Sequence, residues 1–230
     1  MRVNTVYLSR IHFAMGQVIS LVNQKGGVSK STTSVHLAYW LKLKKKRKTL
    51  LIDADSQKSS SLWVKGMEET KIPVEVIGSP DDLLEQIPEL AAGYDYAIVD
   101  GPASLSEATR AILFRSDLAF IPVQPTGVDL RSASDAMRLV KQAQSVRGGL
   151  PKAVMFLSRA VKGTKLKDEA IALLSKNPEA TLLDTVIHQK QAIADTSGQS
   201  ATVWDIPGRP ASESASEYEK LFTEMLKQLP

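Results

Sequence analysis

The sequence predicts an α/β fold, in which a single domain holds a mostly parallel, doubly wound sheet with helices on both faces. Short runs of continuous apolar residues recur along the chain, which is typical of strands buried on both sides. Segments with the helical spacing of apolar residues separate these runs, as the crossovers of a parallel sheet require. The 230 residues are enough for one large domain with its own core.

Seven apolar runs are the expected strands, and polar or turn-forming residues bound each of them. They are residues 17–23, 48–55, 73–78, 94–100, 118–124, 152–158 and 180–187. Helices are expected at residues 31–46, from residue 79 onward, at 129–147 and at 212–228. The second of these helices has the clearest start, because Ser79 can cap it and Pro80 suits its first position.

Composition narrows the class of protein. Hydrophobic residues make up 43% of the chain and charged residues 23%, a balance typical of globular proteins. No apolar run approaches the ~20 residues of a membrane span, and the first residues lack the pattern of a secretory signal. The chain has no cysteine, which excludes disulfides, thiolate metal sites, iron–sulfur clusters and cysteine nucleophiles. A cytoplasmic location is therefore expected.

The segment NQKGGVSKSTT, at residues 23–33, indicates a phosphate-binding loop. It joins the first expected strand to the first expected helix, at the edge of a parallel sheet where ligands bind. Gly26 and Gly27 allow the backbone to turn its N–H groups inward, and the helix that follows points its positive end at the same place. Lys30 would then reach the β- and γ-phosphates, and Ser31 would offer its hydroxyl to Mg²⁺. A glycine-rich turn without a ligand is the alternative.

The loop departs from the standard pattern G-x-x-x-x-G-K-[ST], since Gln24 and Ser29 stand in the two glycine positions. An additional lysine, Lys25, precedes the glycines. This KGGVSK segment resembles the deviant Walker A motif, KGGxGK[ST], of the ParA/MinD superfamily of P-loop NTPase type. The resemblance implies that Lys25 reaches across a dimer interface to the partner's nucleotide. Ser29 departs from the motif, because the family usually has glycine there.

Acidic residues follow two further strands. Asp53 and Asp55 have a spacing that would place both carboxylates on one side of an extended chain, facing one pocket. Asp100 ends the strand YDYAIVD. An acid in this place fits the Walker B pattern, in which the carboxylate holds Mg²⁺ through water. The alternative for Asp53 and Asp55 is that both are solvent-exposed acids of a turn.

The segments DADSQ and DGPASL resemble two further motifs of the ParA/MinD superfamily, DxDPQ and DxPPSL. The first resemblance implies that Asp55 positions or activates the hydrolytic water and that Asp53 supports the metal shell. The second implies that the loop after Asp100 senses the γ-phosphate. Relatives often place an adenine-reading asparagine after a later strand, where this chain has Ser158, so the residues that read adenine are not predicted.

These motifs together predict a site for ATP and Mg²⁺. The expected catalytic residues are Lys25, Lys30 and Asp55. The expected nucleotide-binding residues are Lys25, Gly26, Gly27, Val28, Ser29, Lys30, Ser31 and Thr32. The expected metal residues are Ser31, Asp53 and Asp100.

The resemblance covers residues 15–230, the expected ATPase domain, and is greatest to compact ParA-type partition ATPases. Residues 1–14 form an N-terminal extension outside it. Two interpretations of this extension stay open. Either Met15 is the start of the protein, or residues 1–14 are an added segment that packs on the domain.

The resemblance implies three partners: a second copy of the chain in a nucleotide-sandwich homodimer, non-specific DNA of the nucleoid, and a ParB-like or other cargo adaptor. The basic residues in the region of the DNA surface of relatives are Arg159, Lys162, Lys165, Lys167, Lys176 and Lys190. The denser run Lys42–Lys48 is interpreted as the end of a helix, where cations complement the carbonyl groups.

The last helix has an apolar face that could pack on the sheet or dock on a membrane. Packing is favoured, because the helix carries four glutamates and only two lysines, whereas anionic membranes attract a basic polar face. No stable membrane association is expected.

The resulting hypothesis is a slow, partner-stimulated ATPase. It would dimerise with ATP, bind DNA without sequence preference, and segregate a plasmid or position another cargo at the nucleoid. Two alternatives stay open. One is a nucleotide-dependent dimerisation switch whose hydrolysis is lost through Ser29, and the other is a MinD-like membrane-associated ATPase.

Overall fold

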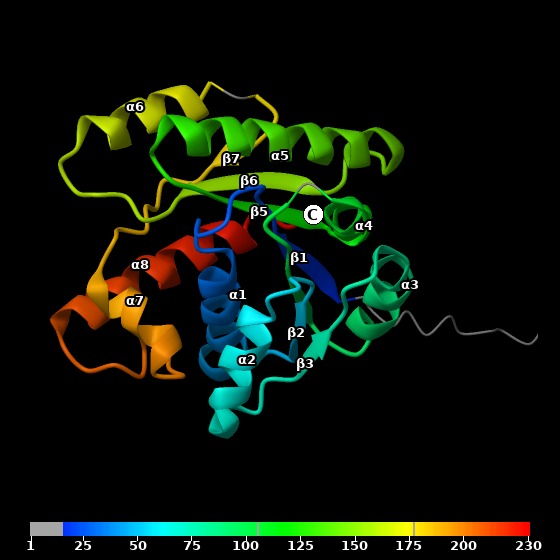
Figure 1. Cartoon of the computed structure of the whole chain (residues 1–230), viewed down its shortest axis with the longest axis horizontal. Helices are drawn as coiled ribbons and strands as arrows, with labels where there is room; N and C mark the ends of the chain where they lie inside the picture. Colours follow the sequence, from blue (N-terminus) through cyan, green and yellow to red (C-terminus); the bar gives the residue numbers. More distant parts are fainter. Residues whose placement is uncertain (1–15, 105, 177) are drawn as a thin grey trace, which may run out of the picture.

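A computed structural model of the chain describes residues 16–104, 106–176 and 178–230, so residues 1–14 and Met15 lie outside the described residues. The centre of the described part is a seven-stranded sheet in the order β3-β2-β4-β1-β5-β6-β7, with every neighbouring pair parallel (Figure 1). The strands are β1 (Gln17–Leu21), β2 (Thr49–Asp53), β3 (Val74–Val76), β4 (Tyr96–Asp100), β5 (Leu118–Val123), β6 (Lys152–Leu157) and β7 (Thr181–Leu182).

Helices link the strands and lie on both faces of the sheet (Figure 1). They are α1 (Lys30–Tyr39), α2 (Ser59–Gly66), α3 (Pro80–Ala91), α4 (Glu107–Arg115), α5 (Gly127–Val146), α6 (Lys165–Leu174), α7 (Gln191–Gly198) and α8 (Arg209–Leu226). A π-helical segment (Trp40–Lys44) continues α1, and a short 3₁₀-helix (Glu68–Thr70) precedes β3. As predicted, the Ser79 hydroxyl accepts a hydrogen bond from the Asp82 N–H at 3.4 Å and caps α3.

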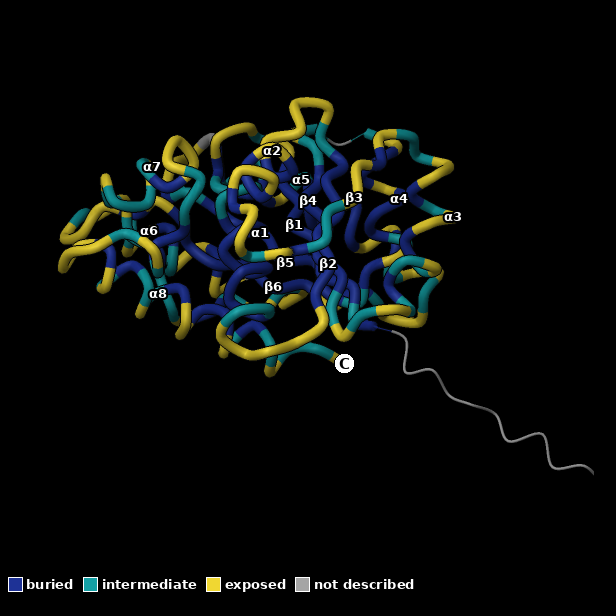
Figure 2. Tube along the Cα trace, turned by 90° about the horizontal axis from the view of Figure 1, so that it is seen from below, coloured by how far each residue is buried: buried dark blue, intermediate teal, exposed yellow. Residues whose placement is uncertain are grey.

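Side chains alternate along the buried strands between two cores, one on each face of the sheet. Helices α3 to α6 pack against one set of strand residues, which includes Val99 and Ile121. Helices α1, α2 and α8 pack against the other set, which includes Ile98 and Phe120. Figure 2 shows the buried chain at the centre of the molecule and the exposed chain at its periphery. The predicted doubly wound, parallel α/β fold is confirmed.

Helix α8 belongs to the second core. Tyr218, Leu221, Phe222 and Met225 of this helix are fully buried. The expected packing of the last helix on the sheet is therefore confirmed. None of the described helices is long and apolar enough to cross a membrane.

The basic run Lys42–Lys48 ends the first helix, as predicted. The Lys45 N–H donates to the Trp40 carbonyl at 2.9 Å, five residues back, which closes the π-helical segment. Lys46 then adopts a φ of 56°, in the left-handed region that ends helices. The Lys45 ammonium lies 4.9 Å from the centre of the Trp40 ring. The run is thus a helix terminus that also covers an aromatic side chain.

Four helices, α2, α4, α6 and α7, were not among the predicted elements. Helices α2 and α7 have only eight residues each and no side-chain cap, so their periodic signal is weak.

The last strand is also shorter than predicted, since only Thr181–Leu182 forms β7. Beyond it, the Leu183 and Ile187 N–H groups still bond to the carbonyls of Met155 and Leu157. The chain therefore follows β6 as a loop that reaches the carboxyl edge of the sheet.

Candidate functional site

The carboxyl ends of the central strands lie level at one edge of the sheet. Leu21 of β1 and Asp53 of β2 both pair with Asp100 of β4. The loop after β1 and the acids after β2 and β4 are therefore neighbours, as the prediction required. A pocket of about 580 Å³ opens at this edge, a size typical of small-molecule sites.

The pocket has two ends, which the strand order separates. The loop end is lined by Gly26, Gly27, Ser29, Lys30, Ser31, Thr32, Asp55 and Ala103. The distal end is lined by Trp63, Arg159, Ile187, His188, Gln189, Lys190, Ile193 and Tyr218. Asp55 follows β2 on one side of β1, whereas Arg159 and residues 187–190 follow β6 and β7 on its other side. Trp63 is the exception among the distal residues, because its helix α2 follows β2.

Side chains from neighbouring strands hold the carbonyl groups of the loop between β1 and α1. Gln124 and Arg159 each donate to the Gly27 carbonyl at 2.8 Å, and the Ser158 hydroxyl donates to the Val28 carbonyl at 3.0 Å. Within the described residues, no hydrogen bond uses the backbone N–H groups of 26–29. These N–H groups and the first turn of α1 are thus available to an anion.

The backbone of the loop turns through two residues in the left-handed region. Gly27 has a φ of 75°, and Ser29, the residue immediately before α1, has a φ of 76°. The position of the missing glycine therefore keeps the glycine-like conformation with a serine in it. A non-glycine residue in this region costs about 1 kcal/mol.

Lys30 lies deep in the loop end, with an exposed fraction of only 6%. Its ammonium donates to the Lys25 carbonyl at 3.0 Å. Burial lowers the pKa of Lys30, and the charges of Asp100 and Asp55 oppose that shift. The lysine thus lies between the backbone of the loop and the two carboxylates, as expected for a group that contacts a phosphate.

Asp100 is fully buried at the end of β4. Its Oδ1 accepts a hydrogen bond from the Ser34 hydroxyl at 3.0 Å, while its Oδ2 is buried with no hydrogen-bond partner among the described residues. Burial raises the pKa of Asp100 to about 6, Asp53 adds to the rise, and the nearby hydroxyls of Ser31, Ser60 and Ser34 oppose it. A buried oxygen without a donor, beside the Ser31 hydroxyl, is an arrangement suited to a cation or its bound water.

The two aspartates after β2 differ from the prediction that both face one pocket. Asp55 lines the pocket, but Asp53 is fully buried and is not among the lining residues. The Asp53 carboxylate accepts from the N–H groups of Asp55 at 3.1 Å and Ser61 at 2.8 Å. The prediction assumed that side chains two residues apart in an extended strand point to the same side. It fails here because β2 ends at Asp53 and the chain turns before Asp55. Asp53 fixes the start of α2 and adds negative charge near Asp100, while its role in a metal shell stays a prediction.

Lys25 does not line the pocket in the single chain and pairs instead with an acid of α5. Its ammonium lies 2.9 Å from Oδ2 of Asp129, in the first turn of α5. Asp129 is fully buried, and the Thr126 hydroxyl also donates to it. The predicted action of Lys25 across a dimer stays a prediction. An intramolecular partner for this lysine was not visible in the sequence, because 104 residues separate Lys25 from Asp129.

The loop after Asp100 begins against the end of β1 and lies beside the loop after β1. The Gly101 N–H donates to the Leu21 carbonyl at 3.0 Å, and an added Cβ at Gly101 would lie only 2.7 Å from the same carbonyl oxygen. Glycine is therefore required for this close approach. The contact brings Ala103 to the wall of the pocket beside Gly26. A loop in this place is well positioned to respond to a bound phosphate.

A cluster of aromatic rings packs around His36 next to the distal end. His36 of α1 is fully buried and stacks on the Tyr218 ring with centroids 4.6 Å apart. Its Nδ1 lies 2.7 Å from the Thr32 carbonyl, and its Nε2 accepts from the Val203 N–H at 3.2 Å, which defines a neutral ring protonated at Nδ1. Burial lowers the pKa of His36 to about 4. His36 thus connects α1, which starts at the loop, to the helix that carries Tyr218.

The residues of the distal end were largely missed by the sequence prediction. Gln124 and Ser158, which adjoin this end, were given no contact with the loop between β1 and α1, yet both hold its carbonyl groups. Lys190 was placed in a basic surface, but its ammonium bonds to Glu217 at 2.8 Å and only 13% of its side chain is exposed. Residue spacing carries no signal for such contacts, because they join segments that meet only in the folded chain.

The comparisons with known proteins agree with this geometry. Residues 19–203 match the family described as the CobQ/CobB/MinD/ParA nucleotide binding domain. The maintenance of carboxysome distribution protein A of Gloeobacter kilaueensis is 37% identical over 116 residues, which cover 50% of this chain and 52% of that protein. The chromosome-partitioning ATPase Soj of Thermus thermophilus is 27% identical over 244 residues, which cover 92% of this chain and 96% of that protein.

Solved structures share the fold. An McdA–ATP complex from Cyanothece superposes with a TM-score of 0.78 at 15% identity, over 94% of this chain and 98% of that chain. The MinD cell division protein of Aquifex aeolicus superposes with a TM-score of 0.71 at 20% identity, over 94% of this chain and 99% of that chain.

Proposed function

Because the chain belongs to the CobQ/CobB/MinD/ParA nucleotide-binding family, we propose that it is a partition or positioning ATPase that binds and hydrolyses ATP at the loop end of the pocket. The observation that carries the proposal is the position of Lys30, buried beside unoccupied loop N–H groups and between the charges of Asp55 and Asp100. Backbone N–H groups and a helix N-terminus bind phosphate, and the lysine adds a positive charge where the transferred phosphoryl group lies.

The residues at this end also fit Mg²⁺. Asp100 supplies a buried carboxylate oxygen without a donor, and Ser31 supplies a hydroxyl next to it. Oxygen ligands of this kind, completed by water and phosphate, are those that Mg²⁺ prefers. Bound Mg²⁺ would neutralise part of the negative charge on the phosphates. The Asp53 carboxylate would act on this site through its charge, since its oxygens already accept backbone N–H groups.

Asp55 is the group we assign to the attacking water. It lies at the wall of the pocket, close enough to Lys30 for their charges to interact. A carboxylate here can accept a hydrogen bond from water and orient it toward the terminal phosphate. The proton that the water releases would pass to the phosphate or to the carboxylate, and the bond to the ADP oxygen would break.

The proposed active state is a nucleotide-sandwich homodimer. Lys25 would exchange its ion pair with Asp129 for the phosphates bound by the partner subunit. The ion pair stabilises the single chain only modestly, because the side chain of Lys25 is partly exposed. A nucleotide bearing several negative charges is a stronger partner for the ammonium, so ATP would favour the dimer.

We further propose that the dimer binds DNA without sequence preference and acts with a cargo adaptor at the nucleoid. The candidate residues narrow to exposed Lys162, Lys165 and Lys176, because Lys190 is paired with Glu217, Arg159 holds the loop, and Lys167 lies 3.5 Å from Asp168. The relatives named as partition and carboxysome-distribution proteins support a cargo of either kind.

Charge reversal tests the DNA surface. Lys162→Glu with Lys165→Glu should weaken ATP-dependent binding equally on unrelated DNA sequences, and should reduce the salt slope by about 0.9 for each DNA phosphate that the variant no longer neutralises. The matched control is Lys45→Glu with Lys46→Glu, which changes the same charge at the end of the first helix. Loss of binding in the control alone would place the DNA surface elsewhere.

Phosphate release separates the ATPase from its alternatives. ATP should be hydrolysed slowly by the chain alone and faster with DNA and adaptor. ATP binding and dimerisation without any phosphate release would favour the dimerisation switch. In that alternative, the serine that replaces the usual glycine at position 29 would be the cause of the lost hydrolysis. Co-sedimentation with liposomes rather than DNA would favour the membrane-associated alternative, which the burial of Leu221, Phe222 and Met225 does not support.

A further inference from the structure

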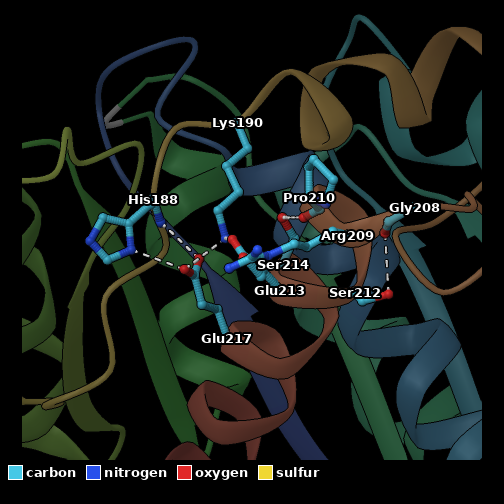
Figure 3. A network of polar contacts seen from close by, with 9 residues as sticks. All are labelled: His188, Lys190, Gly208, Arg209, Pro210, Ser212, Glu213, Ser214 and Glu217. Atoms are coloured by element: carbon cyan, nitrogen blue, oxygen red, sulfur yellow. Dashed lines mark hydrogen bonds and ion pairs between the residues drawn. The ribbon is translucent and has the colours of Figure 1, made fainter.

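Glu217 of α8 makes more polar contacts at the distal end than any other side chain shown there (Figure 3). Its Oε2 accepts from the His188 N–H at 3.1 Å. Its Oε1 lies 3.0 Å from His188 Nδ1 and 2.8 Å from Lys190 Nζ. One carboxylate thus holds both the backbone and the side chains of the segment 188–190, which lines the pocket.

The contacts of Glu217 are well shielded from solvent. The side chains of His188 and Glu217 are each 18% exposed, and that of Lys190 is 13% exposed. Charge-assisted hydrogen bonds in such surroundings are stronger than exposed ones. A second acid of the same helix, Glu213, lies 3.8 Å from Lys190 and 2.9 Å from Arg209, which extends the network along α8 (Figure 3).

Helix α8 also forms part of the distal end directly. Tyr218, the residue after Glu217, lines the pocket, and its buried hydroxyl has no hydrogen-bond partner among the described residues. The backbone of 188–190 has a second support, because the Gln189 N–H donates to the Ala160 carbonyl at 2.9 Å. The wall is therefore fixed on one side by Ala160, just after β6, and on the other side by Glu217.

The geometry points to Glu217 as a positioning residue for the nucleoside part of the bound nucleotide. The inference rests on the proposed function, which places the phosphates at the loop end. Asp55 and Asp100 lie on one side of β1, so the terminal phosphate lies there and the nucleoside extends toward β6 and β7. That direction leads to the wall that Glu217 holds.

Glu217 acts through His188 and Lys190, so its effect is one of preorganisation. A wall already held in its binding position loses less conformational freedom when a ligand arrives. The effect must appear with a ligand that reaches the distal end and must be absent with a ligand that fills only the loop end. ATP and inorganic tripolyphosphate are such a pair.

The test compares Glu217→Gln with Glu224→Gln in the full chain. Glu224 lies two turns further along α8 and accepts from the Thr185 N–H at 3.2 Å and from its hydroxyl at 2.5 Å, but neither residue lines the pocket. Both variants lose one carboxylate that ties α8 to the segment after β7. Calorimetric titration with Mg-ATP and with magnesium tripolyphosphate measures the two affinities.

Glu217→Gln should bind ATP about tenfold more weakly and tripolyphosphate within about twofold of the parent, while Glu224→Gln should change neither affinity. Hydrogen exchange should rise at the His188 N–H in the first variant alone. Should Glu217→Gln not fold, Glu217→Asp keeps the charge but withdraws the carboxylate by one methylene, and the same pattern is expected.

Each of the following outcomes would overturn the inference. Equal ATP affinity in Glu217→Gln and the parent would remove any positioning role. An equal loss for ATP and tripolyphosphate would make Glu217 a general support of the fold, as would the same loss in Glu224→Gln. If the parent binds tripolyphosphate and ATP equally well, the nucleoside does not use the distal end. If the parent binds neither ligand, the proposed function fails and the inference fails with it.

Discussion

The loop end and the distal end share one pocket but are assembled from the chain in different ways. The loop end comes mainly from the continuous segment 23–33, to which Asp55 and Asp100 are added at the ends of neighbouring strands. The distal end combines Trp63 of α2, segments that follow β6 and β7, and Tyr218 of α8. Phosphate binding uses backbone N–H groups that a short segment can present by itself, whereas a wall made of side chains needs several packed elements.

The two ends also differ in how far their polar groups are satisfied. At the loop end, Lys30 is buried, Ser29 has a positive φ, and one oxygen of Asp100 has no partner among the described residues. At the distal end, Glu217 and His36 have partners for each of their polar atoms, and the Tyr218 hydroxyl is the exception, with no partner among the described residues. The loop end therefore keeps polar groups that a ligand could satisfy, whereas Glu217 and His36 hold the distal end in place before a ligand arrives.

The largest effect is expected at the loop end, from Lys30→Ala. ATP affinity should fall about 1,000-fold, which corresponds to about 4 kcal/mol, because the variant removes the main positive charge at the phosphates. Thermal stability should not fall with it, since a buried ammonium is costly to desolvate. Calorimetric titration measures the affinity, and the exposed Lys65→Ala on α2 is the control. Unchanged ATP binding in Lys30→Ala would show that the loop end is not a phosphate site.

A pH titration of stability tests how firmly His36 joins the two ends. Its pKa is about 4 in the folded chain against 6.5 normally, so the unfolded chain binds more protons between these values. The free energy of unfolding should therefore fall by up to about 3 kcal/mol as the pH drops from 6.5 to 4.

The raised pKa of Asp100, about 6 against 3.8, acts in the opposite sense, since its contribution favours folding at low pH and is lost as the pH rises through this window. A comparison with His36→Asn, measured by chemical denaturation at each pH, cancels that contribution. Parallel pH profiles for the parent and His36→Asn would contradict the assignment of a buried neutral His36.

Asp55→Ala should separate binding from chemistry at the loop end. The steady rate of phosphate release should fall about 100-fold, while ATP affinity stays within about threefold, because a water-orienting carboxylate acts mainly in the transition state. Phosphate release and calorimetric titration give the two quantities. If ATP binding is lost instead, Asp55 contributes to the ground-state site rather than to the attacking water.

Ser29→Gly should produce the smallest effect. The φ of 76° suits glycine better than serine, so the variant should be more stable by about 1 kcal/mol, less the extra backbone entropy of glycine in the unfolded chain. Thermal unfolding without nucleotide measures this gain, and Ser59→Gly at the start of α2 is a control in which no gain is expected. A loss of stability in Ser29→Gly would mean that the serine makes an interaction that compensates for its backbone.

The sequence was sufficient for the parts of the molecule that depend on neighbouring residues. The order of the strands along the chain, the start of α3 at Ser79, the phosphate loop and the acid at the end of β4 were all predicted from local patterns. Local patterns predict these features because strand burial, helix capping and a turn with glycine depend on a few consecutive residues. Even so, the local pattern wrongly predicted that Asp53 faces the same pocket as Asp55, because the strand ends at Asp53 and the chain turns there.

Contacts between distant segments could be decided only by the tertiary structure. Gln124, Ser158 and Arg159 hold carbonyls of the loop between β1 and α1, yet at least 97 residues separate each of them from the residue whose carbonyl it contacts. Likewise, Lys190 looked like a surface cation until the fold placed it against Glu217 of α8. The residue types at these positions carry no signal by themselves, because their roles arise from which strands become neighbours and which helix covers them. The sequence therefore determined a loop at the end of β1 with the features of a phosphate site, and the packing of α8 and the loops after β6 and β7 determined the shape of the rest of the pocket.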